Sequence, residues 1–188
     1  MPACFPISRQ WRCVAVFLAL LFAGRLESGV TSREYDVKAA FLFNFASFVE
    51  WPPKTFSRSD GPLVIGVLGR DPFGPSLDEI VQDQHSHDHA LIVCRFSHIE
   101  DMPHCHILFV CSSEERHMTE ILRRLRGQPV LTVGDLPGFA AAGGGIGFVT
   151  TNHVGLEINP QAIRAANLVV SAKLYKVARV VGAPFDSP

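Results

Sequence analysis

A continuous apolar run, Leu63-Val-Ile-Gly-Val-Leu68, lies between Gly61-Pro62 and Gly69. The run contains no polar residue, which is typical of a strand buried on both faces in a parallel sheet covered by helices. Similar apolar runs occur at residues 90–96, 107–111 and 129–133. Together they predict an α/β fold, a single-domain three-layer sandwich with a mostly parallel, Rossmann-like central sheet flanked by helices.

Helical patterns alternate with these runs. Apolar residues recur three or four positions apart between residues 34 and 50 and predict a helix, which the prolines after Trp51 end. The residues expected to face inward on this helix are Val37, Phe41, Leu42, Phe45, Phe48 and Val49. Further helices are expected at residues 73–81 and, with Ser112 or Ser113 as its N-cap, up to Arg126.

The C-terminal part predicts a hairpin followed by two helices. The hairpin strands are expected at residues 145–150 and 154–158. Asn159 followed by Pro160 is typical of a helix N-terminus, because Asn caps free amides and Pro is tolerated at the first helical position. The last helix is expected after Asn167, with Leu174, Val177, Val180 and Val181 facing inward. These elements place residues 34–182 in one domain.

The composition fits a globular protein. The 188 residues are 47% hydrophobic and 19% charged, which excludes a disordered chain. Seventeen Lys and Arg residues against eighteen Asp and Glu residues give a net charge of -1. The chain therefore has no excess positive charge with which to hold nucleic acid.

The N-terminus has the features of an export signal. Two arginines precede about a dozen apolar residues that begin at Cys13, which is the length of a signal-peptide core and too short to span about 30 Å of hydrocarbon. We expect a signal peptide at residues 1–28 and a periplasmic protein, with cleavage after Ala23 or near Ser28; an uncleaved membrane anchor is the alternative. Without residues 1–25, the chain keeps 14 basic and 18 acidic residues, a charge of -4.

No catalytic pattern stands out in the sequence. The turn at residues 69–74 lacks the glycine spacing of a nucleotide-binding loop, and Pro72 removes an amide from it. We find no nucleophile motif and no Cys-x-x-Cys pair. Asp135 is expected to act as a helix N-cap. We therefore predict no enzyme activity, no catalytic residue and no cofactor.

Three histidines, His85, His87 and His89, alternate along one segment. In an extended strand they would lie on one side and form a ligand set for Zn or Cu. We favour a polar loop, because structural metal sites usually draw their ligands from separate elements. No metal site is therefore predicted, and an exported metal-dependent enzyme is the least favoured function.

Two further predictions concern single residues. Phe43 lies off the apolar stripe of its helix and is a candidate contact for a partner protein, the alternative being burial under a loop.

After removal of the signal peptide the chain keeps three cysteines, Cys94, Cys105 and Cys111. Because three is an odd number, at least one of these thiols has no intramolecular partner. Cys94 and Cys105 are expected two strand spacings apart, about 9.6 Å, which exceeds the reach of a disulfide. No disulfide is predicted.

Several short motifs follow one another between residues 38 and 181. They are Lys38-Ala-Ala-Phe-Leu-Phe-Asn-Phe45, Phe48-Val-Glu-Trp-Pro52, Ile65-Gly-Val-Leu-Gly69, Cys105-His-Ile-Leu-Phe109, Pro129-Val-Leu-Thr-Val133, Asp135, Gly138-Phe139, Gly143-Gly-Gly-Ile146 and Glu157-Ile-Asn159. In this order they resemble the YfiR family. The resemblance implies a secreted regulator, linked to biofilm formation, that binds and represses the sensor part of a membrane diguanylate cyclase and so lowers cyclic-di-GMP.

The resemblance also implies partners. These are a membrane sensor protein, either a diguanylate cyclase or a sensor kinase, and an OmpA-like lipoprotein that draws the regulator off; a homodimer is left open. Of the half-cystines known in the family only Cys105 is matched, since residues 63–65 and 139–149 contain no cysteine. A redox-responsive mechanism is therefore not implied for this chain.

A small-molecule-binding sensory module is the alternative function. Sheets of this class bind ligands beyond the carboxyl ends of their strands. The expected ligand site is therefore formed by the loops at residues 69–74, 111–114 and 134–138.

Overall fold

The computed structural model describes residues 28–182, except residues 57, 59 and 103. The chain divides into two compact units, Met1–Glu34 and Tyr35–Pro188. The described part of the first unit is the start of helix α2 (Ser28–Phe48), and the architecture below is that of the second unit. The expected signal peptide lies outside the described residues, apart from Ser28. None of the helices in the described part combines the length and the apolar character needed to cross a membrane.

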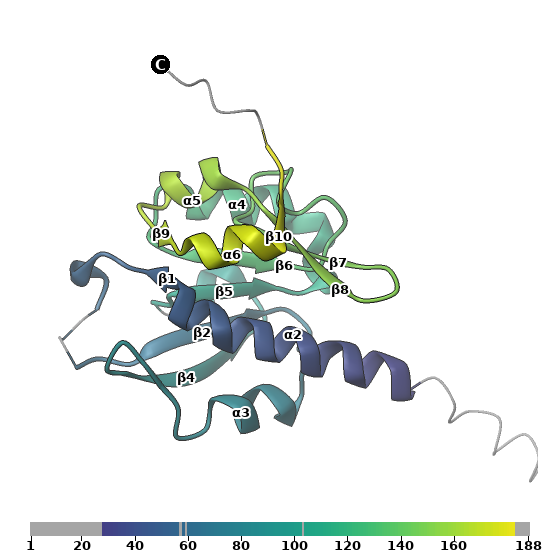
Figure 1. The fold of residues 1–188 in the computed structure, drawn as a ribbon, viewed down its shortest axis with the longest axis horizontal. Coiled ribbons are helices and arrows are strands. Elements are labelled where there is room, and N and C mark those ends of the chain that lie inside the picture. Colours follow the sequence, from purple (N-terminus) through teal and green to yellow (C-terminus); the bar gives the residue numbers. More distant parts are fainter. Residues whose placement is uncertain (1–27, 57, 59, 103, 183–188) are drawn as a thin grey trace, which may run out of the picture. The chain divides into compact units, whose positions relative to one another are not determined.

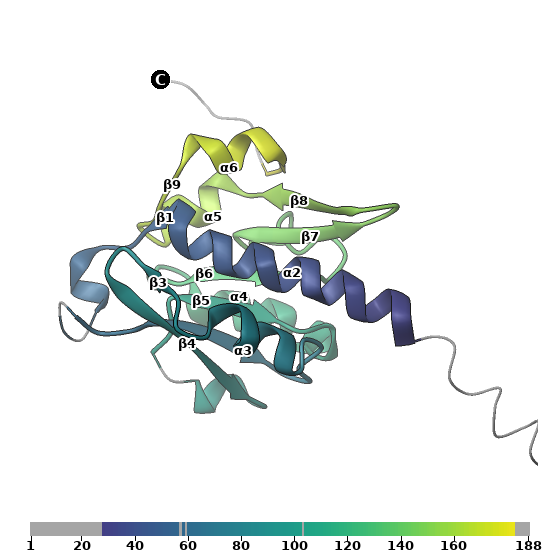
Figure 2. The ribbon, with the colours of Figure 1, turned by 60° about the horizontal axis from the view of Figure 1, so that its bottom comes forward.

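The second unit is built on an eight-stranded sheet (Figures 1 and 2). Its strands are, in spatial order, β10 (Ala178–Val180), β8 (Val154–Ile158), β7 (Ile146–Thr150), β6 (Leu131–Gly134), β5 (Ile107–Val110), β2 (Leu63–Leu68), β4 (His89–Phe96) and β3 (His85–Ser86). All neighbours run parallel except β7 with β8 and β3 with β4. Strand β2 lies between β4 and β5, as in a Rossmann-like sheet, so the predicted fold class is confirmed.

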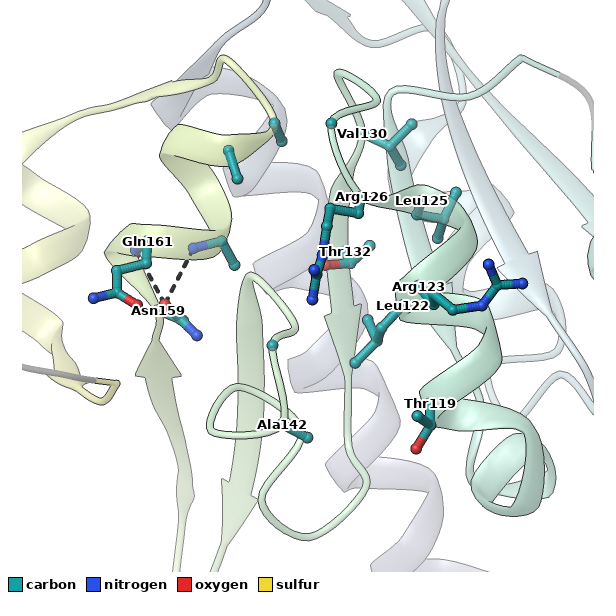
Figure 3. Close-up of a pocket in the computed structure, with 15 residues that line it drawn as sticks. Thr119, Leu122, Arg123, Leu125, Arg126, Val130, Thr132, Ala142, Asn159 and Gln161 are labelled. Carbon is teal, nitrogen blue, oxygen red and sulfur yellow. Dashed lines mark hydrogen bonds between the residues drawn. The ribbon is translucent and has the colours of Figure 1, made fainter.

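Helices cover both faces of this sheet. The shorter elements are α3 (Pro75–Val81), α4 (Met118–Leu125), α5 (Pro160–Ala165), α6 (Ala172–Val177), the 3₁₀ helices η1 (Pro53–Thr55), η2 (Ile99–Asp101) and η3 (Ser112–His117), and the paired strands β1 (Val49–Glu50) and β9 (Val169–Val170). Ile65 and Val67 of β2 pack with α2 and α3, whereas Val64 and Leu68 pack with α4. Figure 3 shows α4 in front of the sheet and α2 behind it, with α5 following the end of β8. The molecule is therefore layered as helix, sheet and helix.

Helix α2 buries the apolar stripe that its sequence predicts, with one change. Leu42 and Phe45 have no exposed surface, and neither has Val49 directly after the helix. Val37 is 44% exposed, because the neighbouring Lys38 takes the inward position and is only 2% exposed. The prediction that Val37 faces the core was therefore wrong.

The last predicted helix is a short helix followed by a strand. Helix α6 ends at Val177, and strand β10 then pairs in parallel with the outer edge of β8. Leu174 is buried as predicted, but Val177 and Val180 are 66% and 55% exposed. The helical prediction was wrong here because the free edge of β8 offers hydrogen bonds to a segment rich in β-branched residues.

The ring of Phe139 fills space that two glycines leave open. A Cβ atom on Gly134 would lie 2.7 Å from this ring, and one on Gly144 would overlap the ring and lie 2.9 Å from the Phe139 carbonyl oxygen. Phe139 is itself 1% exposed and has no room to move aside. The glycines before β7 thus allow close packing as well as the expected turn, in which Gly143 has a φ of 110°.

We expect Gly144→Ala to lower the free energy of unfolding by about 1–3 kcal/mol, because the added methyl group overpacks the buried ring. Gly155→Ala is the matched control, since a Cβ atom there makes only ordinary contact, 3.5 Å from the Val149 carbonyl oxygen. Urea denaturation measures both variants. Equal stability of the two variants would contradict the proposed packing constraint.

Candidate functional site

Two of the loops expected to bind a ligand pack directly against each other. The amide of Arg70 donates a hydrogen bond to Ser113 Oγ at 2.9 Å. Gly69 has a φ of 95°, and a Cβ atom on it would lie 2.7 Å from Glu114 Oε1. Ser113 is therefore used to hold this contact and does not cap the following helix; Cys111 occupies the N-cap of η3 without a side-chain hydrogen bond, contrary to the predicted serine cap.

An arginine on β4 ties the first of these loops to α3. Arg95 Nε donates to Asp71 Oδ2 at 2.6 Å, and its guanidinium also binds Asp78 and the Gly74 carbonyl oxygen. The hydrogen bond from Arg95 holds the pKa of Asp78 below its ordinary value. These polar groups satisfy one another's hydrogen-bonding capacity. Their role at this end of the sheet is therefore structural.

A buried ion pair lies at the end of β6. Asp135 Oδ2 accepts hydrogen bonds from Lys38 Nζ at 3.0 Å and from Tyr35 Oη at 2.7 Å. The side chains of Lys38 and Asp135 are 3% and 6% exposed, and Asp135 Oδ1 has no hydrogen-bond partner in the described part of the chain. No helix follows Asp135 directly, so the prediction of an N-cap was wrong. The carboxylate instead anchors α2 to the sheet.

The two buried thiols, Cys105 and Cys111, have low nucleophilic reactivity. Burial raises the pKa of Cys111, and the negative charges of Asp135 and Asp71 raise it further. Burial also raises the pKa of Cys105 to about 12, with a smaller effect from Cys94. Because the thiolate is the reactive form, these two side chains are poor nucleophiles at neutral pH. All three cysteines are free in the structure, and their state in the cell stays a prediction.

The three alternating histidines do not share one side of a strand. His87 and Asp88 form the turn between β3 and β4, with φ values of 50° and 68°, and His85 is exposed. The ring of His89 stacks on Phe56 with the centroids 3.7 Å apart. In the described residues no group of three or more His, Cys, Asp or Glu side chains is arranged to hold a metal ion. The geometry is that of a hairpin whose last histidine packs against an aromatic ring.

A second histidine cluster was missed by the sequence analysis. His106 is 2% exposed, and its Nδ1 accepts a hydrogen bond from the amide of Val64 at 3.1 Å. Phe56 stacks on its ring, and Trp51 Nε1 donates to its carbonyl oxygen at 3.1 Å. His106 Nε2 has no partner among the described residues. The only sequence signal was the proximity of two histidines to Cys105, which does not distinguish a core position from a loop.

Burial lowers the pKa of His106 to about 4, and the nearby His104 and His89 contribute to this shift. His106 is therefore neutral at physiological pH and acts as a hydrogen-bond acceptor inside the protein. Beside it, a cavity of about 360 Å³ is lined by Trp51, Phe56 and His89 among others. A second cavity lies between α4 and α5 (Figure 3). Neither cavity is lined by the carboxyl-end loops.

Phe43, the candidate partner contact, is half-buried at the border of the core cluster formed with α2. It is neither fully exposed nor covered completely. Its exposed part is available to a partner, and its buried part packs on the protein itself. The role of Phe43 in binding remains a prediction.

We expect the stability of the protein to fall as the pH is lowered from 6.5 toward 4. The unfolded chain protonates His106 at its ordinary pKa of about 6.5, whereas the folded chain resists protonation down to about pH 4. The loss from this group between pH 7 and pH 4.5 is roughly 2 kcal/mol. His106→Asn keeps an acceptor for the Val64 amide but does not titrate, so its free energy of unfolding should depend less on pH.

The control for this measurement is His85→Asn, because His85 is exposed. Urea denaturation at a series of pH values is expected to show the wild-type pH dependence for this control. A His106→Asn protein with an unchanged pH dependence would show that His106 does not carry the effect.

We expect Lys38→Met to cost about 3–5 kcal/mol in the free energy of unfolding, because it leaves the Asp135 carboxylate buried and unpaired. The double variant Lys38→Met/Asp135→Leu removes both charges and should recover most of this loss. Breaking the exposed pair of Arg124 and Glu100 with Arg124→Ala should cost less than about 1 kcal/mol. Denaturation that finds the double variant no more stable than Lys38→Met would disprove the coupling.

Comparison with known proteins identifies the family of this chain. A model of the YfiR/HmsC-like family matches residues 35–179, from the Tyr35 side of the buried ion pair to strand β10. No curated protein sequence matches the chain. The family match covers most of the second unit, and it confirms the resemblance carried by the motifs around Lys38, Trp51 and Asp135. The chain therefore belongs to the YfiR/HmsC-like family.

Proposed function

We propose that this protein is a non-enzymatic periplasmic regulator that binds the sensor part of a membrane diguanylate cyclase and represses it. The observation that carries the proposal is the match of residues 35–179 to the YfiR/HmsC-like family, which is regulatory rather than catalytic. On this proposal the protein occludes the sensor and so lowers cyclic-di-GMP. An OmpA-like lipoprotein relieves the repression by drawing the protein off.

The arrangement of the polar groups supports action through the protein surface. Two carboxylates at the carboxyl ends of the strands are engaged in ion pairs, Asp135 with Lys38 and Asp71 with Arg95. They stabilise the fold and are held away from solvent or in ion pairs. A macromolecular partner would contact the helices and loops around these groups. Its recognition would depend on a surface that is complementary to it in shape and charge.

The charge of the exported chain supports a basic surface on the partner. Without residues 1–25 the chain carries a charge of -4. Opposite charges accelerate association, and salt screens them over about 8 Å at physiological ionic strength. The association rate constant with the partner is therefore expected to fall as salt rises.

The proposal is tested by capture of the purified protein on immobilised periplasmic sensor domains of diguanylate cyclases, with and without a chelator. We expect capture that the chelator does not change. The triple substitution of His85, His87 and His89 by Ala should also leave capture intact, because substitutions at such a hairpin typically change stability by no more than about 0.5 kcal/mol. Deletion of the gene should raise cellular cyclic-di-GMP.

Two outcomes would contradict the proposal. Loss of capture in the chelator or in the triple variant would indicate a metal-dependent mechanism. Unchanged cyclic-di-GMP after deletion, together with no captured sensor domain, would indicate that the protein regulates something else.

The same capture assay tests Phe43 as a contact. Phe43→Ala is expected to weaken capture by about 2 kcal/mol if this ring is a central contact, since aromatic anchors dominate many interfaces. Val37→Ala is the control, because Val37 lies on the same helix and is 44% exposed. Unchanged capture and unchanged stability of Phe43→Ala would remove this residue from the interface.

A further inference from the structure

A groove of about 730 Å³ lies between helices α4 and α5 (Figure 3). Thr132 of strand β6 lines it, as do Ala142 and Gly143 from the loop before strand β7. This volume lies within the usual range of small-molecule pockets, about 300 to 1,000 Å³. The groove shares no residue with the carboxyl-end loops or with the cluster around His106.

The walls of the groove are mostly small and apolar. Leu122 of α4 lines one side, and Ala162 and Ala165 of α5, with Ala166 directly after that helix, line the other. A Cβ atom on Gly143 would meet no other atom within 4 Å, so the loop leaves this space open. Such walls offer van der Waals contact to the apolar body of a ligand and few hydrogen-bonding groups.

Two buried polar side chains of the groove already have partners. Asn159 Nδ2 donates to the Ala140 carbonyl oxygen at 2.8 Å, and its Oδ1 accepts from the amide of Gln161 at 3.0 Å. Thr132 Oγ1 accepts from the amide of Gly145 at 2.8 Å. These side chains hold the backbone, so the charge that selects a ligand must come from another residue.

Arg126 supplies this charge. In Figure 3 its side chain reaches into the space between the two helices beside Thr132, whereas the guanidinium of Arg123 points away from α5. Arg123 is paired with Glu120 at 2.8 Å. The guanidinium of Arg126 has no hydrogen-bond or ion-pair partner within the part of the chain that the structure describes. A free guanidinium favours the oxygens of a carboxylate, sulfonate or phosphate group.

We propose that the groove binds a small amphipathic organic anion. Its acidic group pairs with Arg126, and its apolar body lies between Leu122 and the alanines of α5. One free guanidinium matches one acidic group, whereas an acidic protein segment would need several basic side chains to offset its charges. The inference goes beyond the proposed regulatory function, and its test requires no partner protein.

The test is an NMR titration of the purified protein with octanoate and, separately, with 1-octanol, which has the same chain length without the charge. Octanoate is expected to shift the amide signals of Gly127 and Gly143, which line the groove. Octanoate should bind at least tenfold more tightly than 1-octanol, on the order of one charge-assisted hydrogen bond. Only octanoate has a charged group that can make this bond with Arg126.

Three variants locate the interaction. Arg126→Gln should weaken octanoate binding about tenfold and leave 1-octanol binding unchanged. Arg116→Gln is the matched control, because Arg116 is also exposed but does not line the groove. Ala165→Trp should fill the groove and abolish binding of both probes, and Ala165 is exposed, so the larger side chain does not enter the core.

Any of four results would overturn the inference. Octanoate shifts that fall outside the groove would place the site elsewhere. Equal affinity for octanoate and 1-octanol, or equal affinity of wild type and Arg126→Gln for octanoate, would remove Arg126 from recognition. Tighter binding of hexaglutamate than of octanoate at the same amides would indicate an acidic protein segment as the ligand.

Discussion

Every residue of strand β2 is buried, and this burial determines the layers around it. Alternate residues of a strand point to opposite faces, so a single covering layer cannot bury them all. Helices α2 and α3 therefore pack on one face, and α4 packs on the other. Close packing extends to Gly66 of this strand, where a Cβ atom would lie 3.1–3.3 Å from the side chains of Phe96, Leu108 and Cys105.

Helix α2 is held across the sheet at two points. At its middle, Lys38 reaches Asp135 at the carboxyl end of β6. After its end, Trp51 donates to the carbonyl oxygen of His106 just before β5. A buried charge is costly unless it is paired, and a buried indole N–H needs an acceptor. Both contacts therefore favour one position of the helix, and Phe43 is presented at a fixed place beside the core.

The paired charges at the carboxyl ends of the strands also bear on function. Sheets of this class usually bind ligands there, but in this protein Gly69 lets the loop contact Ser113 and Glu114, and Arg95 ties the same loop to α3. A groove lies instead on the α4 face of the sheet, where the guanidinium of Arg126 has no partner in the described residues. Surface recognition of a protein partner and capture of a small anion would thus use different parts of the molecule.

Local patterns in the sequence determined the elements that depend on neighbouring residues alone. The apolar run at β2, the hairpin of β7 with β8 and the Asn159 cap of α5 all agree with the structure, because strand burial, turn length and capping are set within a few residues. Only the tertiary structure decided the contacts between distant segments. Lys38 and Asp135 are 97 positions apart, strand β10 forms because β8 has a free edge, and His106 becomes a buried acceptor because Phe56 and Val64 meet it in space. Hydrophobic periodicity does not encode such pairings, since they depend on which distant segments of the chain pack together in the folded protein.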